Sequence, residues 1–233
     1  MSAVQYPPML IGLTGHKYAG KDTAAKILAE MIGNNAKIYH FASLLKNELA
    51  SAFGFDEDRK KILYDPVLKE KPTDAFYLRD AFQSTRRSTS KIYDFVSWLE
   101  RNFDTRLPVC FMRTPREMMQ LWGEWRRSQQ HDYFIRHLES MMMLERPTTV
   151  ELVADVRHLN EAQFITKPGM LHQRNALILV TNNTADAVAQ FDLHESEQGL
   201  AFSSATHIIH NNGDMAKLRA ECARALAEIV NNE

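Results

Sequence analysis

One short stretch carries most of the structural information in this chain of 233 residues: Gly15-His16-Lys17-Tyr18-Ala19-Gly20-Lys21-Asp22-Thr23. An apolar run at residues 9–13 precedes it, and residues 24–32 behind it have helical character. Strand, glycine loop and helix in this order are the context of a phosphate-binding loop of the form G-x-x-x-x-G-K. The glycines let backbone N–H groups turn toward phosphate oxygens, and the positive end of the following helix favours the same anion. A chance Gly/Lys turn is disfavoured because strand, motif and helix agree, so the stretch predicts nucleotide binding.

Within this loop, Lys21 is the point charge expected to meet the outer phosphates of a nucleoside triphosphate. The next residue is normally Ser or Thr, whose hydroxyl binds Mg²⁺, whereas here it is Asp22, followed by Thr23. Lys17 adds a second cation, which either faces the acceptor's phosphate or is solvated. We favour the first reading because two phosphates must meet at this loop in a phosphoryl transferase. The residues expected at the ATP site are Gly15, Tyr18, Ala19, Gly20, Lys21, Asp22 and Thr23.

Composition narrows the class of protein. The net charge of −1 provides no field that recruits nucleic acid or a membrane surface. The two cysteines, Cys110 and Cys222, form no metal or disulfide pattern and fit a reducing compartment. No apolar run approaches the ~20 residues of a membrane span, and residues 1–8 lack the regions of a signal peptide. We therefore expect a soluble cytoplasmic protein with no nucleic-acid or membrane partner.

Apolar periodicity and capping residues predict an alternation of strands and helices. Ser43 is the expected N-cap of the second helix, and Thr114 with Pro115 is expected to begin a later one. This alternation predicts an α/β protein with the three-layer P-loop NTPase fold, a five-stranded parallel sheet flanked by helices. Residues 1–233 are expected to form one domain with a helical acceptor-binding region at 43–143 and a short lid at 184–203. The expected strands are 9–15, 37–42, 149–154, 176–181 and 206–210, and the expected helices are 21–33, 44–53, 74–83, 91–103, 115–130, 133–143, 159–166 and 214–230.

Two further groups of polar residues are candidates for the site. Asp155 follows an apolar strand, where it either holds Mg²⁺ or caps the next helix, and Arg157 could reach the same cleft. Arg116 and Gln120 are four residues apart and share a helix face. A guanidinium grips phosphate bidentately and an amide reads a base edge, although spacing alone equally fits a solvated helix face. Gly123, on the same predicted helix, removes a side chain where a substrate or another helix comes close.

These motifs together resemble the bacteriophage deoxynucleoside monophosphate kinases, within the P-loop nucleoside monophosphate kinase group. The resemblance spans most of the chain in the family's order. It implies transfer of a phosphoryl group from ATP to a deoxynucleoside monophosphate with Mg²⁺, in the host cytoplasm if the protein is viral, and it favours a homodimer. The matching segments are Gly15–Thr23, Phe41-Ala42 with Leu45-Lys46, Arg116-x-x-x-Gln120-x-x-Gly123, Val153-Ala154-Asp155-x-Arg157, His194-Glu195-Ser196-Glu197-x-Gly199 and Asn211-Asn212-Gly213.

The resemblance and the residue chemistry give a set of expected roles. Lys21, Asp22, Asp155 and Arg157 are the expected catalytic residues. Asp22, Thr23 and Asp155 are expected to hold Mg²⁺, partly through water. The acceptor nucleotide is expected to contact Lys17, Lys46, Arg113, Arg116, Gln120, Gly123 and Phe134.

The chain departs from the family pattern at two acceptor positions. Glu124 replaces a threonine, and Phe134 lies where a tryptophan is frequent. Two alternative functions are a P-loop kinase for another small acceptor, similar to dephospho-coenzyme A kinase, and a nucleotide-binding switch with slow ATPase activity.

Overall fold

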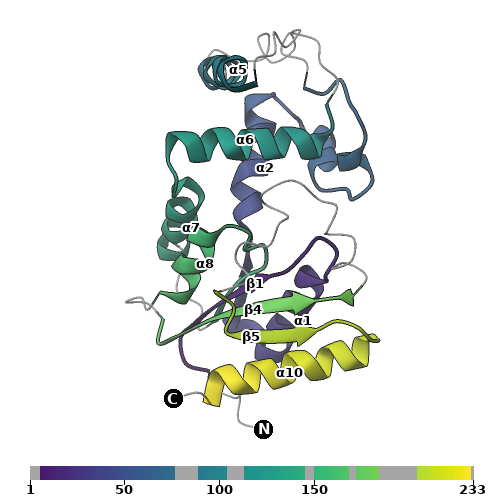
Figure 1. Ribbon diagram of the computed structural model, residues 1–233, viewed down its shortest axis with the longest axis vertical. Helices are drawn as coiled ribbons and strands as arrows, with labels where there is room; N and C mark the ends of the chain where they lie inside the picture. Colours follow the sequence, from purple (N-terminus) through teal and green to yellow (C-terminus); the bar gives the residue numbers. More distant parts are fainter. Residues whose placement is uncertain are drawn as a thin grey trace. The chain divides into compact units, whose positions relative to one another are not determined.

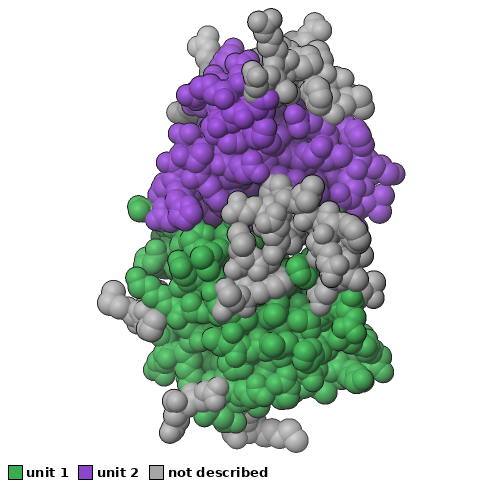
Figure 2. Space-filling view, viewed as in Figure 1, with its two compact units in different colours: residues 1–41, 135–233 green, residues 42–134 purple. Residues whose placement is uncertain are grey.

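A computed structural model describes residues 6–76, 89–103, 113–144, 150–167, 172–183 and 204–231. They belong to two compact units, one formed by residues 1–41 with 135–233 and the other by residues 42–134 (Figure 2). Each unit has its own hydrophobic core. The predicted lid at 184–203 lies outside the described residues.

The first unit is built on a five-stranded sheet in the order β2-β3-β1-β4-β5, with every neighbouring pair parallel. Figure 1 labels the strands β1, β4 and β5 of this sheet. All six residues of the central strand β1 are buried, as expected for a strand covered on both faces. The parallel sheet predicted from the sequence is therefore confirmed. Its strands are β1 (Met9–Thr14), β2 (Ala36–Tyr39), β3 (Val150–Val153), β4 (Arg174–Thr181) and β5 (His207–His210).

Helices cover both faces of this sheet. α1 (Lys21–Ile32) and α10 (Met215–Asn231) share one buried apolar cluster with alternate residues of β1. α8 (Leu159–Thr166) packs on the opposite face, where a Cβ atom on Gly12 would lie 2.9 Å from the Ile165 side chain. Glycine at position 12 therefore allows the close approach of α8. Three layers, this strand order and a glycine loop between β1 and α1 make this the P-loop NTPase fold.

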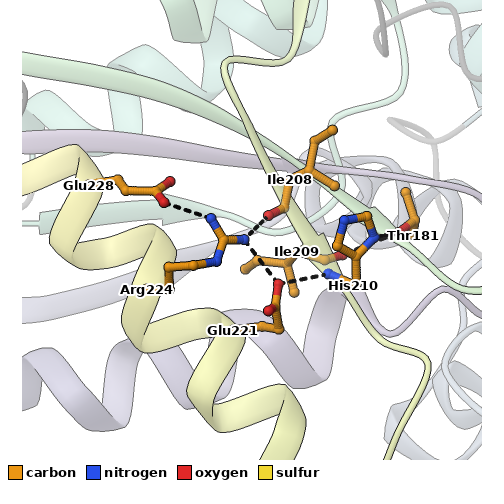
Figure 3. A network of polar contacts seen from close by, with 7 residues as sticks. All are labelled: Thr181, Ile208, Ile209, His210, Glu221, Arg224 and Glu228. Atoms are coloured by element: carbon orange, nitrogen blue, oxygen red, sulfur yellow. Dashed lines mark hydrogen bonds and ion pairs between the residues drawn. The ribbon is translucent and has the colours of Figure 1, made fainter.

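The edge strand β5 is held to α10 by charged side chains (Figure 3). Arg224 donates a hydrogen bond to the Ile208 carbonyl at 2.7 Å, and Glu221 accepts one from the His210 N–H at 3.4 Å. Arg224 also contacts Glu221 at 2.9 Å and Glu228 at 2.7 Å, and its hydrogen bond lowers the pKa of Glu221. Backbone groups of an edge strand that would otherwise invite another chain are thus bonded by side chains. The turn after β5 therefore follows a strand whose backbone is hydrogen-bonded to side chains of α10.

The second unit is helical, with an aromatic core. The Trp122 ring lies 4.9 Å from Phe95 and 4.7 Å from Trp125, and 6.4 Å from Phe53. Trp122 is fully buried and Trp98 and Trp125 nearly so, so the tryptophans serve packing. The elements between β2 and β3 are α2 (Phe41–Ala52), α3 (Glu57–Lys60), η2 (Lys61–Leu63), η3 (Leu68–Glu70), α5 (Thr89–Phe103), α6 (Pro115–Gln129) and α7 (Tyr133–Leu144); α2 begins, and α7 ends, in the first unit.

Most helix predictions are confirmed, including the start of α6 at Thr114 and Pro115, where Thr114 is the N-cap and forms a capping box with Glu117. At the start of α10, Asp214 accepts from the Lys217 N–H at 2.9 Å. The predicted helix at 74–83 is wrong for residues 74–76, which form a bend and a turn, and its remainder lies outside the described residues. No helix within the described ranges combines the length and apolar character that a membrane crossing requires.

The predicted boundary between the second strand and the second helix is wrong. β2 ends at Tyr39 and α2 begins at Phe41, so the strand does not reach residue 42 and Ser43 is not the N-cap. The Phe41 N–H donates to Asp155 Oδ1 at 2.7 Å, and both residues are buried. A carboxylate from the end of β3 therefore satisfies the N-terminus of α2, a contact between residues 114 positions apart that local sequence does not reveal.

Candidate nucleotide-binding site

The P-loop connects the end of β1 to the start of α1. Gly15 has φ +146°, and a Cβ atom there would lie 2.3 Å from the Val180 carbonyl oxygen of β4. Gly20 has φ +96° and is the N-cap of α1, where it offers no side chain to bond the first-turn N–H groups. Tyr18 adopts φ +67° although it is not a glycine, and the residue is 66% exposed. The loop backbone is therefore held in a conformation that ordinary residues adopt only at a cost.

Lys21 lies against the loop that precedes it. Its Nζ donates to the Gly15 carbonyl at 2.7 Å and to the His16 carbonyl at 2.8 Å. The ammonium group is thus positioned by the same loop whose N–H groups and helix terminus favour an anion. The second loop cation, Lys17, has its Nζ 5.1 Å from the centre of the Tyr18 ring.

The two acidic residues predicted to hold Mg²⁺ lie on the first turn of α1 and just after β3. Asp22 is on the first turn of α1, with its side chain 73% exposed and Oδ1 3.8 Å from His40 Nδ1. Asp155, at the end of β3, is only 8% exposed. Of its two readings, the N-cap of the next helix is wrong, because His158 is the N-cap of α8. Arg157 lies between Asp155 and His158 in the sequence, and its backbone N–H donates to the Glu161 carboxylate at 2.9 Å.

The donor set of these residues fits Mg²⁺ held mainly by nucleotide and water. Asp22, Thr23 and Asp155 offer oxygen ligands, which Mg²⁺ prefers. Among the described residues no three His, Cys, Asp or Glu side chains converge on one point. Mg²⁺ is usually held by one or two protein carboxylates together with phosphate oxygens and waters.

Three predicted acceptor residues lie along α6. Arg116 Nε donates to Glu70 Oε1 at 2.7 Å, which joins α6 to η3. Gln120, one turn later, is half-buried. A Cβ atom on Gly123 would lie 3.0 Å from Leu45 of α2, so the small residue serves the approach of another helix. Their role toward an acceptor stays a prediction.

The other acceptor candidates of the second unit are engaged within it. Lys46 Nζ lies 4.2 Å above the Tyr64 ring, and the Arg113 carbonyl accepts from the Thr73 N–H at 3.1 Å. Phe134 is 4% exposed, with the Arg127 guanidinium 4.8 Å from its ring centre. A base that stacks on Phe134 therefore has to share the ring with that guanidinium or use its other face.

A polar cluster around Glu48 in the second unit was not predicted from the sequence. Arg126 donates to both carboxylate oxygens of Glu48 at 2.9 and 3.0 Å, Trp122 donates at 3.3 Å and the Tyr133 hydroxyl at 2.5 Å. Burial opposes ionisation of Glu48, yet the hydrogen bonds from Tyr133 and Arg126 outweigh it and lower the pKa of Glu48. Burial, together with the bond to Glu48, raises the pKa of Tyr133 to about 12. The sequence signal is a glutamate inside the apolar stripe of α2.

Asn211 belongs to a segment that resembles the kinase family, but the sequence predicts no contact for it, and in the structure it touches the P-loop. Its Nδ2 donates to the Ala19 carbonyl at 2.9 Å, across 192 residues of sequence. Sequence reasoning could not assign this contact, because nothing local to the turn after β5 shows that it folds against the loop after β1.

Comparisons with known proteins assign no family. No protein-family model matches the chain, and no curated protein matches it in sequence. Among solved structures, a dephospho-CoA kinase from Campylobacter jejuni is similar with 14% identity and a TM-score of 0.40, over 96% of this chain and 98% of that one. Similarity at this level assigns no activity, so the functional argument depends on the site itself.

Proposed function

We propose that this protein transfers a phosphoryl group from ATP to a deoxynucleoside monophosphate, giving ADP and the deoxynucleoside diphosphate. The observation that carries the proposal is the P-loop, with Lys21 held over the Gly15 and His16 carbonyls at the carboxyl end of β1. Asp155 at the end of the neighbouring strand β3 adds the acidic group that such enzymes place beside the metal.

The residues present support catalysis by positioning and charge neutralisation, without a covalent intermediate. Loop N–H groups and Lys21 would bind the outer phosphates of ATP. Asp22, Thr23 and Asp155 would hold Mg²⁺, which when bound offsets charge on the phosphate oxygens. The acceptor is itself a phosphate monoester whose oxygens are nucleophilic near neutral pH, so no general base is required.

The acceptor residues proposed in the second unit are Lys46, Arg113, Arg116, Gln120, Gly123 and Phe134, with Lys17 from the P-loop. Gln120 presents both a donor and an acceptor, so it can pair with more than one base edge. Phe134 offers a ring that can stack on any base. We therefore propose turnover of at least two deoxynucleoside monophosphates, with Glu124→Thr broadening or shifting the preference.

A direct test incubates the protein with ATP and Mg²⁺ and follows ADP release on addition of each common deoxynucleoside monophosphate in turn. Dephospho-coenzyme A serves as the rival acceptor, and a reaction without acceptor measures plain ATPase activity. Stimulation by a deoxynucleoside monophosphate, lost by ~10³-fold in Lys21→Ala, is the expected result. If only dephospho-coenzyme A stimulated ADP release, it would be the acceptor in place of a deoxynucleoside monophosphate. ADP release independent of any acceptor would favour a nucleotide-dependent switch.

A further inference from the structure

The contact between Asn211 and the P-loop fixes the direction of one peptide group. The Asn211 side chain donates to the Ala19 carbonyl oxygen at 2.9 Å. In a trans peptide, the carbonyl of one residue and the N–H of the next point in opposite directions. Because the Ala19 carbonyl points toward Asn211, the Gly20 N–H points away from it.

Asn211 is itself held by the sheet and by a neighbouring loop. Its backbone N–H donates to the Thr181 carbonyl of β4 at 2.8 Å. Its carbonyl accepts from Asn182 Nδ2 at 2.6 Å. The side chain of the neighbouring Asn212 accepts from the Asn183 N–H at 2.8 Å. The backbone of Asn211 is therefore hydrogen-bonded through both its N–H and its carbonyl, which positions its side-chain amide toward Ala19.

A glycine at position 20 does not by itself fix the orientation of the Ala19–Gly20 peptide. Gly20 has φ +96°, a region open to glycine, and glycine also tolerates the alternative orientations of the peptide that precedes it. If the Ala19–Gly20 peptide turned over, a carbonyl oxygen would replace an N–H on the side where phosphate is expected. The negative end of a carbonyl dipole repels an anion, whereas an N–H group attracts it.

We propose that Asn211 is a positioning residue that locks the Ala19–Gly20 peptide so that the Gly20 N–H is available to a nucleotide phosphate. This inference depends on nucleotide binding at the P-loop but not on which acceptor the protein uses. Asn211 acts through the loop backbone, so its effect should appear in affinity for the phosphates of the nucleotide.

The experiment measures ADP affinity in the presence of Mg²⁺ by calorimetry for the parent, Asn211→Ala and Asn211→Asp. Alanine removes the donor, so we expect ADP affinity to fall ~10-fold, the scale of one hydrogen bond to a charged group. Aspartate has the shape of asparagine but cannot donate, and its carboxylate attracts the Gly20 N–H of the inverted peptide. We therefore expect Asn211→Asp to bind ADP more weakly than Asn211→Ala.

Asn212→Asp is the matched control, because it adds the same negative charge one residue away from the hydrogen bond between Asn211 and Ala19. An affinity loss in Asn212→Asp equal to that in Asn211→Asp would show a charge effect and overturn the positioning role. Affinity within threefold of the parent in both Asn211 variants would also overturn it. Failure of the parent to bind ADP would refute the nucleotide site. If the variants bind ADP in the expected order of affinity but the protein transfers no phosphoryl group, only the proposed reaction would be refuted.

A stability measurement tests the contact independently of any ligand. A Cβ atom on Gly20 would lie 2.3 Å from Asn211 Nδ2, so Gly20→Ala creates a clash that Asn211→Ala relieves. The strain from the positive φ at Gly20 is the same in both backgrounds and cancels in a double-mutant cycle. We expect Gly20→Ala to be less destabilising in the Asn211→Ala background, and equal costs in both would contradict the contact.

Discussion

Asp155 is expected to have two separable roles, one in stability and one in activity. In Asp155→Ala the buried Phe41 N–H loses its acceptor at 2.7 Å, and α2 loses its terminal carboxylate. Losing such a cap and leaving a buried donor unsatisfied costs ~2 kcal/mol of unfolding free energy. For a chain of this size that is a fall of roughly 4–8 °C in Tm.

Asp155→Asn separates the two roles, because asparagine keeps an oxygen where Oδ1 accepts but loses the negative charge. Asparagine and aspartate are about equally good caps, so we expect its unfolding free energy to stay within ~0.5 kcal/mol of the parent. Phosphoryl transfer should nevertheless fall by ~10²-fold in both variants, the scale of removing one preorganised electrostatic group. Urea unfolding gives the free energies, and an assay of ADP release gives the rates.

Two results would refute this reasoning. If Asp155→Asn were as unstable as Asp155→Ala, the hydrogen bond to Phe41 would not be the source of the stability. If Asp155→Asn kept full activity, the carboxylate would have no part in holding Mg²⁺.

Three further outcomes are expected in the second unit. Glu48→Gln removes the charge partner of the largely buried Arg126, so the unfolding free energy measured by urea denaturation should fall by ~3 kcal/mol. A loss under ~0.5 kcal/mol would contradict the buried cluster. The pKa of Tyr133 is raised to about 12, so Tyr133 should contribute no tyrosinate absorbance near pH 10. Because its folded pKa exceeds its unfolded pKa, the contribution of Tyr133 to stability is complete below pH ~10 and is lost as the pH rises through ~12. Arg116→Ala should raise the KM for the monophosphate more than that for ATP, and Glu70→Gln, which removes only its ion-pair partner, should raise it less; equal effects would mean that Arg116 serves the contact with Glu70.

The P-loop, the strands and most helix bounds could be predicted because each has a local cause. Six consecutive buried residues form β1, and Thr114 with Glu117 forms the capping box that begins α6. These signals depend on residues within a few positions of one another, so the sequence contains them directly.

What could not be predicted depends on contacts between distant residues. The start of α2 is set by Asp155, and the P-loop is held by Asn211 from the other end of the chain. Glu48 interrupts an apolar stripe, but only the fold shows that Arg126 and Tyr133 satisfy it. The predicted lid lies outside the described residues, and the assignment of the acceptor residues stays a prediction.

The most direct test of the central claim is the identity of the phosphorylated product. ATP labelled in its γ-phosphate is incubated with the protein, Mg²⁺ and one deoxynucleoside monophosphate, and the products are separated by chromatography. We predict that the label appears in the deoxynucleoside diphosphate in a one-to-one ratio with ADP, and that Lys21→Ala abolishes it. Label found only in inorganic phosphate, at a rate that no deoxynucleoside monophosphate changes, would contradict the account.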